Sequence, residues 1–435
     1  MKHWHQRFFW ILLLFLPTQL GFHFWPDWAG VLGRRVDYLA PTVYLTDILI
    51  VFIMISWFLS SRDRSDGDAI SYQCEIASSK TPRNDKIRKV RFAIIVTLLF
   101  IAINVFFAVN KPVAIYKWLK AVEFVLLGWY IVRTKPKLST IIIPLSIGVF
   151  YSSVLAIAQF FLQHSAGGLL WWLGERTFNA GTPGIARIDW YGRELLRPYA
   201  TFPHPNVLGG FLATVLLLIV LRYLSILGNL KKKIKLFYGT VILVGITALL
   251  LTFSRSAIVV GTIAIAIAIA RNVEHKLRVL GIVLFVFILT SYVLRLTSTE
   301  ESVVVRQQLN DAAIKLWQSS PLFGVGLGNF LVRLPEALPT RTIYFLQPVH
   351  NIYLLLLSEM GIVGIGLIVL WIAWRLNYEF RIRNYGKNST KEIFIIHTSL
   401  FIILLLGLVD HYPLTLQQGQ LMFTVLAGMS LTFVH

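Results

Sequence analysis

The sequence predicts an all-α, polytopic membrane protein that forms a single integral membrane domain over residues 1–435. Of its 435 residues, 56% are hydrophobic and only 14% are charged, whereas soluble domains carry about 25% charged residues. The apolar residues also form continuous runs, many of them close to the roughly 20 residues that a membrane-spanning helix needs. Scarce charge and long apolar runs together exclude an ordinary soluble domain.

About twelve apolar runs are expected to cross the membrane as helices. Several contain Gly or Pro, which membrane-spanning helices tolerate. We expect the first run to be an uncleaved span rather than a signal peptide, because it continues towards Trp25 without a small-residue cleavage site. The runs cover residues 8–25, 41–59, 92–109, 113–131, 139–163, 207–221, 236–253, 256–270, 279–296, 350–374, 392–409 and 419–434.

The distribution of Lys and Arg predicts the orientation of the chain. The formal net charge is +20, and with the N-terminus inside, most of the cations fall on the cytoplasmic side, as the positive-inside rule requires. The largest basic segment, residues 60–91, is expected to be a flexible cytoplasmic loop. Both termini are then cytoplasmic, and the positive charge needs no nucleic-acid partner. The single cysteine, Cys74, excludes an internal disulfide and a cysteine metal cluster.

Two outer segments, residues 164–206 and 297–349, are too long to be simple connectors. We expect both to contain short amphipathic helices and the second to be the catalytic loop. Both contain arginines that the positive-inside rule does not explain, and Arg255 lies at the outer end of a hairpin of spans, in the Thr252–Arg255 turn. An arginine binds phosphate oxygens bidentately and stays charged at any relevant pH. The loop arginines are Arg176, Arg187, Arg193, Arg197, Arg306, Arg333 and Arg341. For several of them the alternative is an ion pair with Asp189, Glu194 or Glu336.

Residues 197–206 are expected to form a rigid, extended entry into the sixth span. Two prolines flank His204, and proline fixes its own φ angle and restricts the residue before it. Asn206 is expected to cap the helix that follows. His204 is a candidate for substrate contact, with a structural hydrogen bond as the alternative.

Residues 303–317 are expected to form an amphipathic helix outside the membrane. An apolar stripe recurs at helical spacing, and Arg306 lies on the neighbouring face. The stripe consists of Val305, Leu309, Ala312 and Leu316. The glycines of residues 324–328 follow, and they predict a tight turn rather than a nucleotide-binding loop because no strand precedes them.

His350 and Asn351 open the tenth span. Near neutral pH an imidazole is the natural general base, and the start of a helix can face an aqueous cavity beside the arginines. The alternative is an interfacial residue that only makes hydrogen bonds. Glu359 lies two to three turns deeper, and Asp410 with His411, at the end of the eleventh span, forms a second possible acid/base pair that ranks behind His350.

The order of these pieces resembles the O-antigen ligase and O-antigen polymerase superfamily, the Wzy/WaaL group. The resemblance is strongest over about residues 190–375, and its motifs all lie on the outer side. The last motif has the histidine, amide, nine-residue gap and glycine that are typical of the ligases. The motifs are Arg197 with Thr201-Phe-Pro-His-Pro-Asn206, Phe253-Ser-Arg-Ser256, Arg306, Pro321-Leu-Phe-Gly-Val-Gly-Leu-Gly-Asn-Phe330, and His350-Asn351-x9-Gly361.

The resemblance implies an inverting, metal-independent glycosyltransferase of the GT-C type that uses no cofactor. Its donor is a glycan on undecaprenyl pyrophosphate at the outer face of the bacterial cytoplasmic membrane. Its acceptor is a hydroxyl of lipid A–core or of another surface glycan or glycolipid. His350 is then the general base, and Arg255 and Arg306 bind the pyrophosphate with help from Arg197. The other expected substrate contacts are His204, Asn206, Asn351, Arg333 and Arg341.

Three other functions stay open at the level of the sequence. A polymerase of the same superfamily joins repeat units to one another. A transporter or lipid-glycan flippase also has many spans, but it should concentrate polar residues at mid-membrane with broken helices. A metal-dependent glycosyltransferase would use Asp27 or Asp37 of the first outer loop.

Overall fold

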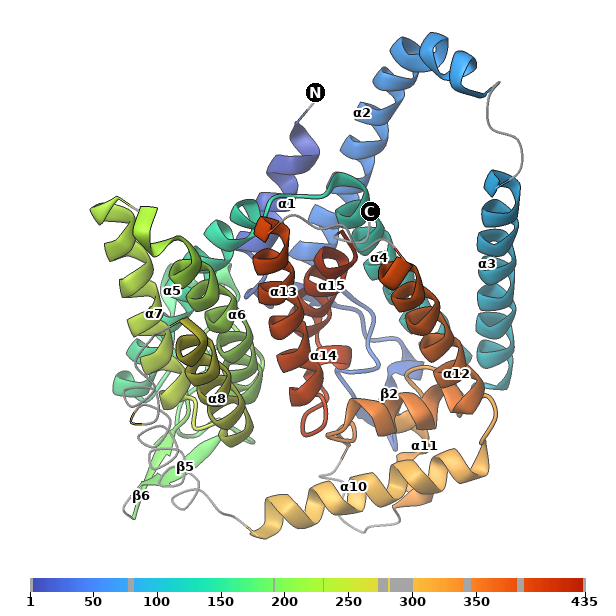
Figure 1. The fold of residues 1–435 in the computed structure, drawn as a ribbon. Coiled ribbons are helices and arrows are strands. Elements are labelled where there is room, and N and C mark those ends of the chain that lie inside the picture. Colours follow the sequence, from blue (N-terminus) through green and yellow to red (C-terminus); the bar gives the residue numbers. More distant parts are fainter. Residues whose placement is uncertain are drawn as a thin grey trace.

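The computed structural model describes residues 3–76, 82–190, 192–229, 231–272, 281, 300–338, 346–381 and 387–432. These residues form a bundle of long helices with shorter elements in the connections (Figure 1). The helices are α1 (Trp4–Leu14), α2 (Leu45–Ile76), α3 (Pro82–Phe107), α4 (Lys111–Thr134), α5 (Leu138–Leu162), α6 (Pro205–Ile226), α7 (Lys232–Leu251), α8 (Arg255–Asn272), α10 (Glu300–Ser319), α11 (Phe330–Ala337), α12 (Ile352–Arg381), α13 (Lys387–Leu406), α14 (Tyr412–Thr415) and α15 (Gln417–Thr432).

Three antiparallel strand pairs lie in the connections. They are β1 (Gly21–His23) with β4 (Thr42–Tyr44), β2 (Gly30–Val31) with β3 (Arg34–Arg35), and β5 (Arg187–Trp190) with β6 (Arg193–Leu196). Three 3-10 turns accompany them: η1 (Asp27–Ala29), η2 (Gly168–Leu173) and η3 (Leu227–Asn229). In Figure 1, β5, β6 and α10 lie at one end of the bundle, and the start of α1 and the facing ends of α2 and α3 lie at the other.

Five described helices are long and apolar enough to cross a membrane. They contain Val90–Phe107, Leu138–Leu162, Pro205–Ile226, Lys232–Leu251 and Ile352–Trp374. Two shorter apolar segments are Leu45–Ser60 and Arg255–Ala266. The helical membrane fold is therefore confirmed, while the count of twelve spans stays a prediction. The ninth predicted span, 279–296, lies outside the described residues except for residue 281.

The first predicted span, residues 8–25, is wrong in its extent. α1 ends at Leu14 and has 11 residues. At 1.5 Å per residue this is about 16 Å, which is short of the ~30 Å hydrocarbon core. Pro17 follows the helix, and residues 21–23 then pair with residues 42–44 as strands. The apolar residues after Leu14 therefore belong to a packed loop rather than to a continuous helix.

The segment 60–91 also differs from the expected flexible loop. α2 continues to Ile76, and α3 already begins at Pro82. Proline suits the first position of a helix, and the Lys, Arg, Asp and Ser residues here are compatible with helix. The expected boundaries followed the apolar run, which marks where a helix meets lipid rather than where the helix ends.

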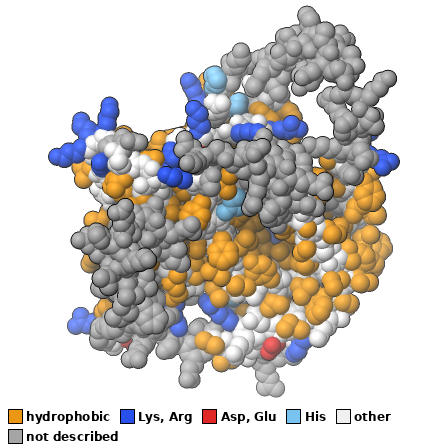
Figure 2. Space-filling model, viewed as in Figure 1, with side chains coloured by type: hydrophobic (Ala, Val, Ile, Leu, Met, Phe, Trp, Pro, Cys, Tyr) orange, Lys and Arg blue, Asp and Glu red, His pale blue; other side chains and the backbone are white. Residues whose placement is uncertain are grey.

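α6 is the central helix of the bundle. All residues from Val207 to Leu221 are buried, and α6 packs against α7, α8 and α13. A helix that is apolar all round must be covered by neighbours in this way. On the outside, hydrophobic side chains cover the middle of the face in Figure 2, and Lys and Arg lie towards its margins. This distribution suits a surface that faces lipid between two aqueous phases.

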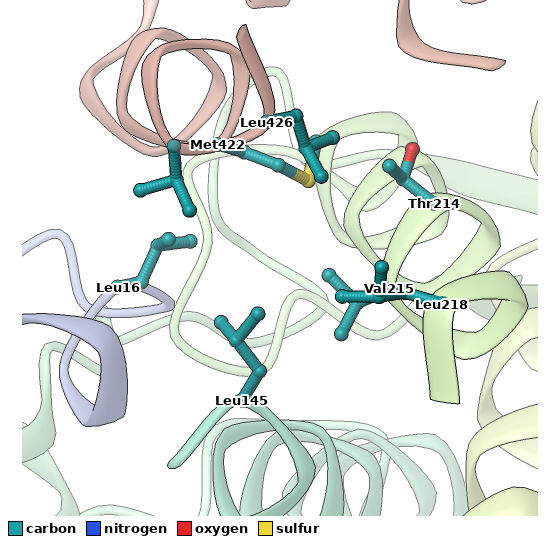
Figure 3. Close-up of a pocket in the computed structure, with 8 residues that line it drawn as sticks. Leu16, Leu145, Thr214, Val215, Leu218, Met422 and Leu426 are labelled. Atoms are coloured by element: carbon teal, nitrogen blue, oxygen red, sulfur yellow. The ribbon is translucent and has the colours of Figure 1, made fainter. Parts of the chain in front are cut away.

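A small cavity lies in the core where α5, α6 and α15 meet the residue after the α1 C-cap, Leu16 (Figure 3). Its volume of about 10 Å³ is close to the space that one water needs. Its lining is apolar except for Thr214. The cavity is therefore a packing gap and cannot hold a glycan or a lipid chain.

Candidate active site

Arg197 connects the first outer segment to the α7–α8 turn. It follows the β5–β6 hairpin, and its Nε donates a hydrogen bond to the carbonyl oxygen of Thr252 at 2.8 Å. Its Nη2 donates to Oδ1 of Asn206 at 2.7 Å. Two of its donors are thus used to hold three segments of the chain together, next to Arg255, the first residue of α8.

His204, not Asn206, caps α6, which corrects the expected helix cap. The His204 Nδ1 accepts a hydrogen bond from the backbone N–H of Asn206 at 3.1 Å. Pro205 occupies the first helical position, where a missing N–H costs nothing. The side chain of Asn206 is therefore free to work elsewhere, and its Nδ2 donates to Oδ2 of Asp410 at 3.3 Å.

Asp410, His411 and His350 form a compact cluster. The Asp410 Oδ1 accepts a hydrogen bond from the backbone N–H of His411 at 2.8 Å. The two imidazole rings meet edge to face with centroids 5.0 Å apart, and one ligand atom from each of the three residues lies within 4.8 Å of the others. The His411 Nδ1 is occupied by Thr415 Oγ1 at 2.6 Å.

The histidines of this cluster are held in the neutral form. Burial lowers the pKa of His411 to about 4 and that of His204 to about 3. Burial and then Arg306 lower the pKa of His350, while Asp410 opposes them. Burial raises the pKa of Asp410, but His411, His350, His204 and Arg306 together bring it below its usual value. Asp410 is therefore an anion beside neutral imidazoles.

His350 differs from His411 in having an unused ring nitrogen. Its Nδ1 is buried and has no hydrogen-bond partner among the residues that the structure describes. A buried polar atom without a partner is rare enough in folded proteins to need an explanation. A substrate hydroxyl that donates to an imidazole nitrogen would satisfy it, and such a contact is what a general base requires.

Arg306 lies beside this cluster, and Arg197 and Arg255 are close enough to Arg306 to interact with it electrostatically. The Arg306 Nη1, from α10, donates to the carbonyl oxygen of Val409 at 3.4 Å, directly before Asp410. Burial, with Arg255 and Arg306 acting in the same direction, lowers the pKa of Arg197 to about 10. Arg306 also acts electrostatically on Arg255. Neighbouring guanidinium groups repel one another and an anion that binds between them relieves the repulsion, so the arrangement suits a phosphate-bearing ligand.

Two other loop arginines form ion pairs, and one of them, Arg333, is an expected substrate contact. Arg333, on α11, pairs with Glu336 at 2.5 Å, and Arg187 pairs with Glu194 at 2.6 Å. These are two of the ion pairs that the sequence left open as alternatives. Arg341 lies outside the described residues. The Asn351 Oδ1 accepts hydrogen bonds from the backbone N–H groups of Tyr353 and Leu354, so it caps α12 beside His350.

The glycine motifs allow the 321–328 turn to pack closely against α12, the helix that begins next to His350. Gly361 interrupts α12 with φ 65° and ψ −173°, and a Cβ there would lie 2.4 Å from the Leu322 carbonyl oxygen. Gly324, Gly326 and Gly328 also have positive φ, which confirms the tight turn. The buried carboxylate of Glu359 accepts a hydrogen bond from the backbone N–H of Phe330 at 3.2 Å. This acid therefore holds α12 to the start of α11.

Some contacts of the site have no signal in the sequence. Tyr38, from the first outer loop, meets the His411 ring edge to face at a centroid distance of 5.5 Å. Gly210 of α6 faces Tyr412, whose hydroxyl would lie 1.8 Å from an added Cβ. Neither Asp27 nor Asp37 belongs to a cluster of three metal-ligating side chains among the described residues.

A comparison with protein families matches residues 239–369 to the family described as O-antigen ligase. The match includes Arg255, Arg306, His350 and Gly361. No curated protein matches the chain. The family match covers most of the predicted resemblance, all but its first part, and includes two of its three arginines. Residues 239–369 are therefore similar to the O-antigen ligase family, which agrees with the resemblance that the motifs in this stretch indicate.

Proposed function

We propose that this membrane protein is an O-antigen ligase-like glycosyltransferase. It moves a glycan from undecaprenyl pyrophosphate to an acceptor hydroxyl, such as one on lipid A–core, at the outer face of the bacterial cytoplasmic membrane. The observation that carries the proposal is the position of Arg306 beside Asp410 and His350, with Arg197 and Arg255 close enough to Arg306 to interact electrostatically, together with the Nδ1 of His350, which is unpartnered among the described residues. The family match supports the same class of enzyme.

The reaction follows from the charges of the site. His350, neutral at physiological pH, takes the proton of the acceptor hydroxyl as its oxygen forms a bond to the anomeric carbon. The bond from that carbon to the pyrophosphate oxygen breaks, and the lipid pyrophosphate leaves with the electron pair. Attack from the opposite face inverts the anomeric configuration. Fixed cations stabilise the charge that develops on the leaving group, and Asp410 stabilises the imidazolium.

The ligase is favoured over a polymerase because His350, Asn351 and Gly361 have the spacing typical of the ligases. A ligase transfers a preassembled chain once, whereas a polymerase produces a ladder of products from single repeat units. Product gels separate the two. A transporter is less well supported, because the cluster lies at the ends of α6, α8, α12 and α13 rather than at mid-helix.

The direct test is an assay of the purified protein with undecaprenyl-pyrophosphate glycan and candidate acceptors. Arg255→Ala and Arg306→Ala should each lose roughly 10²–10³ in rate, as for other donors that stabilise an anion. Arg187→Ala removes an exposed arginine that pairs with Glu194 and should keep the wild-type rate. The proposal fails if His350→Ala is as active as wild type, or if the two arginine variants bind donor normally and turn it over at full rate.

Metal removal is expected to leave the rate unchanged. The donor atoms of His350, Asp410 and His411 are close enough to hold a cation, but Arg306 lies beside them and a divalent ion would add to its charge. We therefore expect full activity in EDTA. Loss of activity that Mg²⁺ or Mn²⁺ restores would replace this mechanism with a metal-dependent one.

A further inference from the structure

The 3-10 turn η2 carries an apolar surface that the protein itself does not cover. No residue of η2 is buried. Leu169 is 84% exposed, Trp171 50% and Trp172 65%, and the two indole rings contact each other edge to face at 4.9 Å. Three large apolar side chains on six residues are costly to leave in water, because transfer of apolar surface out of water is favourable.

The exposure is built into the fold, because the base of the turn is firmly held. The buried Glu175 carboxylate accepts the backbone N–H groups of Ala166 and Gly167 at 2.7 and 2.8 Å. It also accepts Nε2 of Gln159, on α5, at 2.7 Å. Thr18 Oγ1 donates to the carbonyl oxygen of Leu173 at 2.7 Å. The turn therefore presents its apolar side chains from a fixed base.

This surface continues an apolar face of α5. The exposed residues Ile143, Phe150, Val154 and Phe161 recur at the spacing of one helical face. α5 is one of the helices long and apolar enough to span the membrane, so this face meets lipid. Phe161 is 77% exposed at the last turn of α5, and η2 begins six residues after that helix ends.

The composition of η2 and its neighbours suits the membrane interface rather than the hydrocarbon core. Tryptophan is enriched where headgroups meet acyl chains. Arg176 follows the turn, is exposed, and lies 5.3 Å over the ring of Tyr199, where its cation can meet a lipid phosphate. Apolar side chains with a cation at one edge are the pattern of interfacial anchors.

We propose that η2 is an interfacial anchor that inserts Leu169, Trp171 and Trp172 into the leaflet at the end of the bundle where the candidate site lies. The anchor also has a defined connection to that site. The Gln159 Oε1 accepts the backbone N–H groups of Tyr199 and Ala200 at 3.0 and 2.7 Å, in the segment that runs from Arg197 to Asn206. Anchoring η2 thus sets the height of this segment relative to the lipid headgroups.

Site-specific fluorescence tests the anchor without donor or acceptor, so its outcome is independent of the proposed function. The full chain carries Cys74→Ser to remove its single cysteine, together with Leu169→Cys labelled with NBD. The protein is placed in nanodiscs of phosphatidylcholine and phosphatidylglycerol. We expect blue-shifted emission, quenching by doxyl-labelled phosphatidylcholine, and several-fold weaker quenching by aqueous iodide than for the control.

The matched control is Pro183→Cys, an exposed position in the same outer segment, which should show the opposite pattern. A label at position 169 that iodide quenches as strongly as the label at 183 would overturn the anchor. Protection of the label from both quenchers would also overturn it, because a protein partner would then cover η2. Trp172→Cys provides a second labelled position if Leu169→Cys does not fold.

Discussion

Asp410 lies between two histidines and the asparagine that also holds Arg197, and its charge sets how easily His350 takes up a proton. Burial and Arg306 lower the pKa of His350, whereas Asp410 raises it. The base must be neutral to act, so the rate should rise with pH through this pKa and level off above it. Since the pKa of His350 is below its ordinary value, the plateau should extend to slightly acidic pH.

Replacing Asp410 by Asn should move this acidic limb to lower pH. The substitution removes the negative charge that raises the pKa of His350 and leaves Arg306, which lowers it. The plateau rate should also fall, because the imidazolium formed in the reaction loses its counter-charge. Rate–pH profiles of wild type and Asp410→Asn measure both effects. An acidic limb that stays in place or moves to higher pH would contradict the assignment of His350 as the base.

At the residue scale, the sequence predicts chemistry better than it predicts contacts. Residue type and position single out His350, Arg255 and Arg306 as candidates for the site. The contact of Tyr38 with His411 depends on how the first outer loop folds over the eleventh span, and no local pattern records that. Asparagine is a strong capping residue, so the sequence favours Asn206 as the cap of α6. His204 takes the cap because Pro205 fits the first helical position.

At the scale of elements, the break in α12 brings the 321–328 turn against the helix that begins next to His350. Gly361→Ala adds a Cβ at a positive φ angle and 2.4 Å from a backbone oxygen. Because the clash is with the backbone, no side-chain movement can relieve it. We expect destabilisation by more than ~1 kcal/mol and loss of activity, measured by thermal unfolding in detergent and by the transfer assay.

Gly366→Ala is the matched control on the same helix. A Cβ there meets nothing within 4 Å, and alanine favours helix over glycine by about 1 kcal/mol. This variant should be as stable as wild type or slightly more so, with an unchanged rate. Equal effects of the two substitutions would show that the helix break at Gly361 has no special role.

The approach of α14 to α6 is a second element on which the site depends. A Cβ on Gly210 would lie 1.8 Å from the Tyr412 hydroxyl, and Tyr412 directly follows His411. Gly210→Ala should displace Tyr412 and lower the transfer rate at least tenfold, whereas Gly239→Ala on α7, with open space around it, should not. Full activity of Gly210→Ala would show that α14 can move without disturbing Asp410 and His411.

Apolar runs predict that a helix exists more reliably than where it ends. The runs at 139–163 and 207–221 correspond to α5 and α6. The run at 8–25 becomes a short helix and a strand, because Pro17 follows α1 and residues 21–23 find partners at 42–44. The polar segment 60–91 becomes mostly helix. Both differences arise because an apolar run shows which residues avoid water. Where a helix ends depends instead on the backbone hydrogen bonds that each residue makes.

At the scale of the whole molecule, the net charge of +20 is informative through its distribution. Most cations fall in segments that the sequence assigns to the cytoplasm, and the arginines of the candidate site are outside those segments. In Figure 1 the start of α1 and the facing ends of α2 and α3 lie at one end of the bundle, and β5, β6 and α10 lie at the other. The sequence therefore predicts that these two ends of the bundle lie on opposite sides of the membrane.

Cysteine labelling in intact cells and in inverted vesicles tests that prediction. Cys74, in α2 near the α2–α3 connection, should react with a membrane-impermeant maleimide only in inverted vesicles, because the positive-inside rule places this basic segment in the cytoplasm. Pro183→Cys in a Cys74→Ser background should react only from outside. Position 183 lies in the predicted outer segment, residues 164–206, which also contains Arg197 of the candidate site. Labelling of both positions from the same side would remove the predicted topology, and with it the outer-face site on which the transfer mechanism depends.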